Sequence, residues 1–204
     1  YRRKLIERNN TRQTLIASIR SVMLEKTPDS WENAERRITL IRAVAGRLGL
    51  PAKEAEPLEL LAVLYDIGEI QLPREILFKE SALDAAEWTL VQTHPESGYR
   101  IAQAVPELQP IADAIYAHHE NWDGKGYPRR LAGEAIPLAA RILALVDSYV
   151  AMTSDRPYRK AMSRAEALEA IRTGAGTRFD PLLADLFLET AAHLFGLYFA
   201  RDFL

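Results

Sequence analysis

The chain has 204 residues, 48% of them hydrophobic and 26% charged, which suits one globular domain with an appendage. Its formal net charge of −2 argues against nonspecific binding to long nucleic acid, but leaves room for a small anionic ligand held by a few arginines. The absence of cysteine excludes disulfides and thiolate metal sites, and the apolar runs are too short to span a membrane, so we expect a cytoplasmic domain.

The first part of the chain predicts three helices. Residues 3–25 carry a loose helical stripe of apolar side chains, and we assign residues 1–26 to an N-terminal linker helix. The rest, residues 27–204, is assigned to a single domain. It begins with a helix predicted from Asp29 to Leu48, which a glycine and a nearby proline bring to an end. Residues 56–66 are almost entirely apolar and predict a buried helix.

Four further helix starts carry local signals. Two capping boxes, in which a side chain and a glutamate three residues later bond each other's backbone amides, predict two helices: Asp84 with Glu87, and Ser163 with Glu166. Two prolines, Pro137 and Pro181, mark two more, because proline fits the first turn of a helix. Alternating strand patterns are absent, so the predicted fold class is all-α.

The segment HHENWDGKGYP, residues 118–128, joins two adjacent histidines to a glycine-rich aromatic loop. Neighbouring residues of a helix point about 100° apart, so both imidazoles face one site only at a helix end or a kink. Neutral imidazole is the commonest nitrogen ligand of metal ions. We therefore predict that His118 and His119 bind a divalent transition metal, with iron or manganese favoured over zinc because thiolates are absent.

Three other positions carry potential ligands, and each also has an ordinary structural explanation. Asp66 ends a buried helix and could simply hydrogen-bond that helix end. His94, before a proline, could interact with the dipole at a helix C-terminus. Asp147 lies inside a helix among core residues, where a buried carboxylate needs a cation. The ordered set is more specific than any one member: Asp66, His94, His118, His119 and Asp147.

From about residue 25 to residue 190, the chain resembles the HD-GYP family, HD-domain phosphohydrolases associated with hydrolysis of cyclic di-GMP. The resemblance rests on ordered motifs: YDIGEIQLPREIL, His94-Pro95, HHENWDGKGYP, IPLAARILALVD, MTSDRPYRKAMS and GAGTRFDP. It implies an HD-type helical bundle and a cyclic di-GMP or related nucleotide ligand. It also implies that Tyr127, Arg156 and Arg159 contact that nucleotide or its phosphates.

For the metal, the resemblance implies two positions that share Asp66 as a bridging ligand. His94, His118 and His119 would hold one ion, and Asp147 would help to hold the other.

The chain departs from the family pattern around the second ion. Tyr65 stands where the family carries histidine, and the best register puts Asn33 at an upstream histidine and Asp29 at a glutamate. That position therefore loses both imidazoles, and phenol and amide groups are poor substitutes. We predict one bound ion or none.

Glu69 stands where the family carries lysine, and we assign it to the catalytic site with Asp66. It could repel an anionic substrate, at a cost of about 3 kcal/mol for charges ~6 Å apart in an effective dielectric of ~20. It could instead be a metal ligand that partly replaces a lost histidine. The predicted function is a cyclic di-GMP phosphodiesterase-family domain with weak or lost hydrolysis; the alternative is an inactive nucleotide sensor, dimerisation element or docking module.

Two further expectations concern partners and the loop. The N-terminal linker resembles the junction that follows a diguanylate cyclase (GGDEF) domain in the same chain, and its helix could pair in a homodimer. In the loop, Glu120 could orient an imidazole or be a solvated charge at the helix end. Trp122 could stack on a guanine or could simply anchor the loop.

Overall fold

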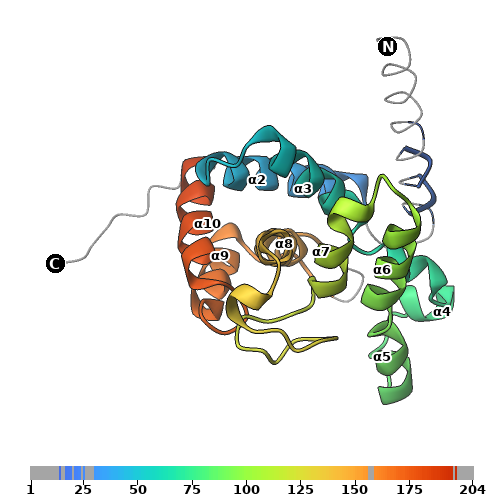
Figure 1. The fold of residues 1–204 in the computed structure, drawn as a ribbon. Helices are drawn as coiled ribbons and strands as arrows, with labels where there is room; N and C mark the ends of the chain where they lie inside the picture. The colour runs from blue at the N-terminus through green and yellow to red at the C-terminus, as the bar shows by residue number, and fades with distance from the viewer. Residues whose placement is uncertain are drawn as a thin grey trace, which may run out of the picture.

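The computed structural model describes residues 14, 17–19, 21–23, 25, 30–155, 159–194 and 196. These residues form helices joined by loops and turns, as Figure 1 shows. The only β-type pairings among them are two isolated bridges, between Asp123 and Ala132 and between Ala175 and Phe179. The predicted all-α fold class is confirmed. Most of the predicted linker helix, residues 1–26, lies outside the described residues.

The elements follow one another in this order: α2 (Trp31–Arg47), α3 (Ala52–Leu64), the 3-10 helix η1 (Ile67–Gln71), α4 (Arg74–Leu77), α5 (Ala85–Val91), α6 (His94–Ala104), the 3-10 helix η2 (Gln109–Ile111), α7 (Ala112–Ala117), the 3-10 helix η3 (Gly133–Ala135), α8 (Leu138–Met152), α9 (Arg164–Gly174) and α10 (Pro181–Leu194). Apart from the linker helix, the predicted helices are present within about four residues of their expected ends. The sequence patterns did not indicate the short elements η1, α4, α6 and α7.

Local sequence signals determine where several helices begin and end. Both predicted capping boxes are formed, at the starts of α5 and α9. Helix α2 begins after Ser30, whose side chain accepts a hydrogen bond from the amide of Asn33. It ends before Gly49, whose φ of 66° lies in the left-handed region that glycine adopts without strain.

Helix α8 runs through the middle of the molecule, with α2, α3, α7, α9 and α10 around it (Figure 1). It is apolar on nearly every side, and Ile142, Leu143, Leu145, Val146 and Val150 are all buried. A helix surrounded in this way contributes most of its surface to the core. Any polar side chain on α8 therefore needs a partner supplied by a neighbouring helix.

A close backbone contact joins η1 to α6, which carry two of the candidate metal ligands at their starts. A Cβ atom on Gly68 would lie 2.0 Å from the carbonyl oxygen of His94 and 2.6 Å from the amide nitrogen of Gly98. Only glycine allows these two backbone segments to approach so closely. The contact therefore fixes the distance between the end of α3 and the start of α6.

Gly68→Ala is expected to lower the free energy of unfolding by about 1–3 kcal/mol, because the added methyl group forces η1 and α6 apart. Gly46→Ala is the matched control: it lies on the exposed side of α2 with no atom within 4 Å of the added Cβ. That control is expected to be neutral or to stabilise by up to ~1 kcal/mol, since alanine favours the helix. Urea denaturation measures both. Equal stability of the two variants would show that the contact is not tight.

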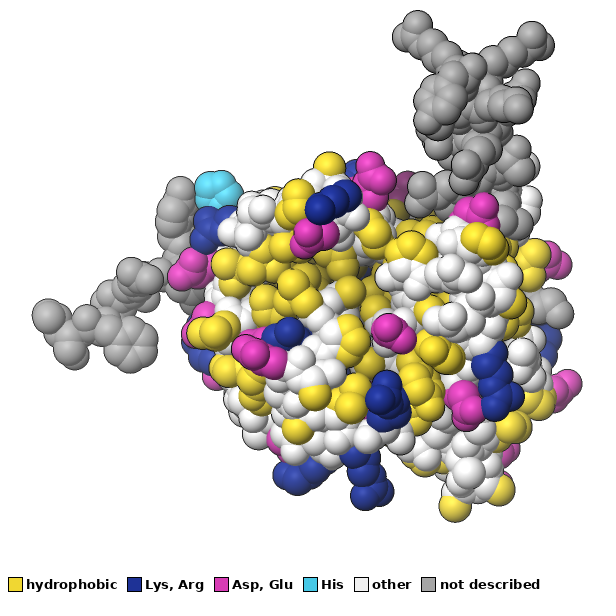
Figure 2. Space-filling model, in the orientation of Figure 1, with side chains coloured by type: hydrophobic (Ala, Val, Ile, Leu, Met, Phe, Trp, Pro, Cys, Tyr) yellow, Lys and Arg dark blue, Asp and Glu magenta, His cyan; other side chains and the backbone are white. Residues whose placement is uncertain are grey.

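The surface fits the near-neutral composition. On the face drawn in Figure 2, acidic and basic side chains are dispersed among hydrophobic ones and form no broad basic patch. Among the described residues, no helix combines the length and apolar character needed to cross a bilayer.

Candidate metal centre

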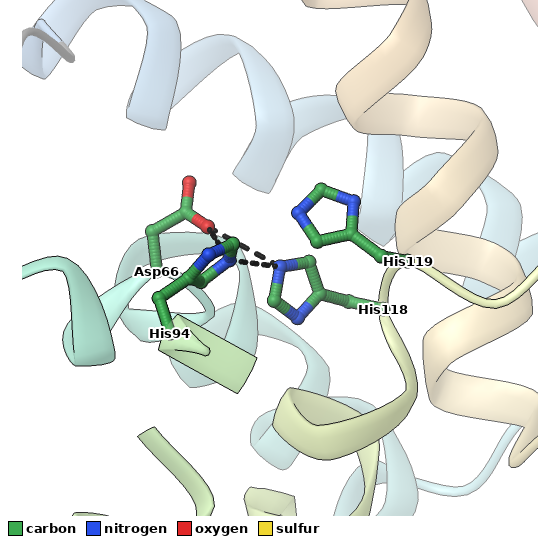
Figure 3. Close-up of side chains that lie close together, drawn as sticks. All are labelled: Asp66, His94, His118 and His119. Carbon is green, nitrogen blue, oxygen red and sulfur yellow. Dashed lines mark hydrogen bonds and ion pairs between the residues drawn. The ribbon is translucent and has the colours of Figure 1, made fainter. Parts of the chain in front are cut away.

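Three segments bring four potential ligands together. Asp66 follows the last turn of α3, His94 is the first residue of α6, and His118 and His119 follow the last turn of α7. One ligand atom from each of these four side chains lies within 4.8 Å of all the others (Figure 3). His94 therefore begins a helix, and does not end one as the dipole explanation required. The adjacent histidines do stand at a helix end, as predicted.

The lone pairs of three of these side chains point at one another. The Nδ1 atoms of His94 and His118 donate to the carbonyl oxygens of Val91 and Ile115, at 2.7 and 2.6 Å. In the neutral rings, each Nε2 is then an unprotonated acceptor. These two Nε2 atoms lie 3.1 Å apart, and each lies 3.3 Å from Oδ1 of Asp66. Three acceptors facing one another repel unless a cation or a proton lies between them.

This geometry matches a metal site. Donor atoms around one ion at ~2.1 Å lie about 3.0–3.4 Å apart for octahedral to tetrahedral angles. A hydrogen bond from the second imidazole nitrogen to a backbone carbonyl is the usual way in which a metal-binding histidine is oriented. The four residues therefore fit a divalent ion held by one carboxylate and up to three imidazoles.

The electrostatics of the cluster show an anionic carboxylate that attracts positive charge. Burial favours the neutral form of Asp66, but hydrogen bonds from protonated His118 and His94 outweigh it and hold the pKa of Asp66 well below its ordinary value. Burial opposes the charged form of His94, but the hydrogen bond and charge of Asp66 raise its pKa, so a proton can take the place that a cation would occupy between these side chains. Burial holds the pKa of His119 well below its ordinary value, and the charge of His118 adds to this effect. An anionic carboxylate beside a neutral imidazole is the protonation state that a metal ion needs.

The loop after the histidines folds back over them. The ring of Tyr127 stacks on that of His119, with centroids 4.7 Å apart, and its amide donates to the His119 carbonyl. A Cβ on Gly126 would lie 2.3 Å from the backbone nitrogen of Asn121, so glycine is required at this return. Burial raises the pKa of Tyr127, and the charges of Asp66 and Glu69 raise it further.

Two expectations about this loop are resolved. Glu120 is buried, and its carboxylate oxygens accept hydrogen bonds from the amides of Arg129 and Leu131, at 2.7 and 3.0 Å. It neither orients an imidazole nor faces solvent; it anchors the far end of the loop. Trp122 forms backbone hydrogen bonds with Arg178 and Gly133 and does not line the cavity described below, which agrees with an anchoring role.

Asp147 has partners of its own, outside the group of four. Its Oδ1 accepts a hydrogen bond from the hydroxyl of Tyr65 at 2.8 Å and lies 3.6 Å from Nη1 of Arg37. The Arg37 side chain is only 2% exposed, whereas that of Asp147 is 29% exposed. Burial raises the pKa of Asp147, while the Arg37 charge and the Tyr65 hydrogen bond oppose that rise. Arg37 is thus a cation beside this carboxylate, and no motif in the sequence marked it.

The other predicted site residues are not among the four converging ligands. Glu69 lines a separate cavity of about 160 Å³ together with Glu25 and Arg74. The side-chain carbonyl of Asn33 accepts a hydrogen bond from the hydroxyl of Ser154, near the end of α8. Two further candidates, Asp29 and Arg156, lie outside the described residues.

Arg159 hydrogen-bonds the C-terminal end of α8. Its guanidinium donates to the carbonyl oxygens of Ala151 and Met152 at the end of α8, at 2.7 and 3.4 Å. It does not line the cavity beside the histidines. In this arrangement Arg159 satisfies carbonyls that a helix C-terminus leaves without partners.

A cavity of about 610 Å³ lies beside the four ligands. His118, His119 and Tyr127 line it, together with Tyr65 and Asp147. Its volume lies within the range of pockets that hold small molecules.

Two more residues that line this cavity were missed by the sequence analysis. Arg178, in the loop before α10, supplies a positive charge that acts on His119. Trp88, from α5, is 46% exposed, and its ring centroid lies 6.4 Å from that of Tyr127. Arg178 lies within the GAGTRFDP motif, which was not assigned a role, whereas Trp88 carries no sequence signal that separates it from an ordinary surface side chain.

Comparisons with known proteins agree with the geometry. The sequence profile of a family described as "HD domain" matches residues 18–183. The cyclic di-GMP phosphodiesterase response regulator RpfG of Xanthomonas campestris is 38% identical over 162 residues, which are 78% of this chain and 43% of that protein. The 3'3'-cGAMP-specific phosphodiesterase 2 of Vibrio cholerae is 31% identical over 187 residues, which are 91% of this chain and 36% of that protein.

A solved structure supports the fold. The cyclic GMP-AMP-specific phosphodiesterase V-cGAP3 of Vibrio cholerae superposes with a TM-score of 0.66 at 22% identity, over 92% of this chain and 51% of that one. The chain spans less than half the length of the two curated relatives it matches.

Proposed function

The chain belongs to the HD domain family, in its HD-GYP-type phosphohydrolase branch, and we propose that it binds cyclic di-GMP or a related cyclic dinucleotide beside a single divalent ion, with hydrolysis weak or lost. The observation that carries this proposal is the convergence of Oδ1 of Asp66 with Nε2 of His94 and His118. Together with His119, these residues would hold iron or manganese, since the site offers nitrogen and oxygen but no sulfur.

The residues around the ion have distinct tasks in this proposal. A bound divalent ion supplies a Lewis acid that polarises a phosphodiester oxygen and makes a water molecule more acidic. Asp66 and the neutral imidazoles keep that ion in place, and the backbone carbonyls behind His94 and His118 keep the two rings aimed. Tyr127 closes one side of the cavity by stacking on His119.

The cavity suits an anion with aromatic bases. Arg178 places a guanidinium on its wall, and guanidinium pairs with phosphodiester oxygens through charge-assisted hydrogen bonds. The half-exposed ring of Trp88 and the ring of Tyr127 offer apolar faces or edges to a purine. By resemblance, Arg156 would add a second phosphate contact. Arg159 would act through the end of α8, where its guanidinium is already engaged.

Weak or absent hydrolysis follows from the state of Asp147 and from Glu69. In this proposal, the hydrogen bond from Tyr65 keeps Asp147 out of the group of ligands. A site that held one ion would leave it both to make water more acidic and to neutralise the phosphoryl oxygens, tasks that paired ions would share. The negative charge of Glu69, felt at Tyr127, adds repulsion toward an anionic substrate. The alternative of an inactive nucleotide sensor rests on the same observations.

The test combines metal content with nucleotide binding. Elemental analysis of the protein purified with added manganese is expected to find one ion per chain. Calorimetry is expected to detect cyclic di-GMP or cyclic GMP-AMP, with binding at least about tenfold weaker in Arg178→Ala, because one charge-assisted contact contributes roughly 1.5–3 kcal/mol. Arg100→Ala is the control, since that arginine is exposed on α6 and paired with Glu96.

The outcomes separate the candidate functions. Nucleotide binding with slow or no turnover supports the proposal, and binding without any turnover favours the sensor. A protein that binds neither metal nor cyclic dinucleotide contradicts it. Unchanged affinity in Arg178→Ala removes that residue from the binding site.

A further inference from the structure

On the basis of the proposed function, we infer that Arg37 is a built-in cation that holds Asp147 out of the metal-ligand set and so limits the centre to one ion. This assigns a positioning role to Arg37, a residue on α2 that is not one of the four ligands. It also assigns a physical cause to the one-ion centre, beyond the absence of two imidazoles.

Arg37 is held firmly where it lies. Its Nε donates to the carbonyl oxygen of Ala62 at 2.9 Å, and its guanidinium lies over the ring of Tyr65, 5.0 Å from the centroid. The guanidinium end faces Asp147, with Nη1 3.6 Å from Oδ1. The carbonyl, the aromatic face and the carboxylate together hold the buried guanidinium in one position.

Tyr65 links Arg37 to the candidate metal centre. Its hydroxyl donates to the same Oδ1 of Asp147 that faces Arg37, and its ring meets that of His118 edge-on, with centroids 5.3 Å apart. Asp147, Tyr65 and His118 line one cavity. Asp147 is therefore a carboxylate next to the ligand cluster, with one oxygen already occupied by a phenol and a guanidinium.

The consequence is a competition between two cations for one carboxylate. An arginine cannot be deprotonated in a protein, so its charge is permanent. A divalent ion bound through Oδ1 of Asp147 would have to displace Tyr65, and one bound through Oδ2 would still lie within a few ångströms of the fixed positive charge of Arg37. Burial weakens screening by solvent, so Arg37 both satisfies Asp147 and repels a second ion.

The experiment measures the number of bound ions in a double-mutant cycle. Metal-free wild type, Arg37→Met, Asp147→Asn and the double variant are each dialysed against Mn²⁺, and bound manganese is counted by elemental analysis. Electron paramagnetic resonance then distinguishes an isolated ion from a spin-coupled pair. Arg36→Met is the control for loss of an arginine from α2, because Arg36 bonds Ser154 at the end of α8 and not Asp147. Circular dichroism verifies folding.

We expect one ion in wild type, Asp147→Asn and Arg36→Met, and a second, spin-coupled ion in Arg37→Met that disappears in the double variant. A folded Arg37→Met protein that still binds one ion overturns the inference. If that variant does not fold, Asp147→Asn decides. An unchanged ion count and Mn²⁺ affinity support the inference, whereas affinity weaker by about tenfold or more shows that Asp147 is already a ligand.

The wild-type count separates this inference from the proposed function. Two ions in wild type overturn the role of Arg37 and leave a metal-dependent phosphodiesterase-family site standing. If wild type binds no ion, the proposed metal centre is contradicted, and Arg37 then has no ion count to limit.

Discussion

Asp66→Asn is expected to empty the metal centre and to abolish any phosphodiesterase activity that the domain retains. Asp66 is the only anion among the four converging ligands, and its Oδ1 lies 3.3 Å from Nε2 of both His94 and His118. An asparagine of the same shape leaves two or three neutral imidazoles to neutralise a divalent charge. Because ligands hold an ion as a unit, we expect Mn²⁺ affinity at least about a hundredfold lower.

The measurement is Mn²⁺ binding by calorimetry, followed by elemental analysis of the dialysed protein. Asp113→Asn is the matched control, because it makes the same change on the exposed side of α7, the helix that ends at His118. That control should bind metal as wild type does. If Asp66→Asn retains its ion at similar affinity, the three histidines hold it without a carboxylate, and the convergence on Asp66 has another cause.

Much of the fold could be predicted because short-range physics determines it. The capping boxes at Asp84 and Ser163 are complete in four residues of sequence, and both are formed. The apolar segment that becomes α8 and the glycine stop after α2 are equally local. The short elements η1 and α7 were missed, because tertiary packing stabilises them more than their own sequence does.

The role of Arg37 could have been found, since a signal was present. Ala34, Arg37, Ile41 and Val44 are all buried, and their spacing of three and four residues marks one face of α2. A charged side chain on a buried stripe needs an opposite charge. Asp147, a carboxylate among core residues of another helix, needs a cation in the same way. Arg37 and Asp147 are 110 residues apart in the chain, and sequence alone does not show which arginine reaches which carboxylate.

The loop contacts could not be predicted in the same way. Glu120 bonds two backbone amides, and Arg159 bonds two backbone carbonyls. Backbone groups are identical at every position, so no residue type marks these partners in the sequence. The same holds for the wall of the cavity, to which α5 contributes Trp88 and the loop before α10 contributes Arg178.

Restoring the lost imidazoles without removing Arg37 is expected to fail. The triple change Asn33→His, Tyr65→His and Glu69→Lys supplies the family's residues, but the guanidinium of Arg37 remains 3.6 Å from Asp147. A divalent ion ~5 Å from that charge, in an effective dielectric of ~20, is repelled by about 7 kcal/mol, which is enough to cancel most of the gain from two new ligands. We therefore expect the triple variant to bind one ion, like its parent.

Adding Arg37→Met to the triple change is expected to bind the second ion more tightly than Arg37→Met alone, because two imidazoles join Asp66 and Asp147, and to raise turnover of cyclic di-GMP with manganese at least about tenfold. Replacing the buried Tyr65 by the smaller histidine leaves a cavity that costs about 1–3 kcal/mol, so folding must be verified by circular dichroism. The change at Asn33 also removes the hydrogen bond that its side chain accepts from Ser154. If the triple variant alone gains the ion and the activity, Arg37 is no barrier. If the parent already turns over at a comparable rate, Tyr65 and Glu69 do not disable the site, and the domain is an ordinary phosphodiesterase that works with one ion.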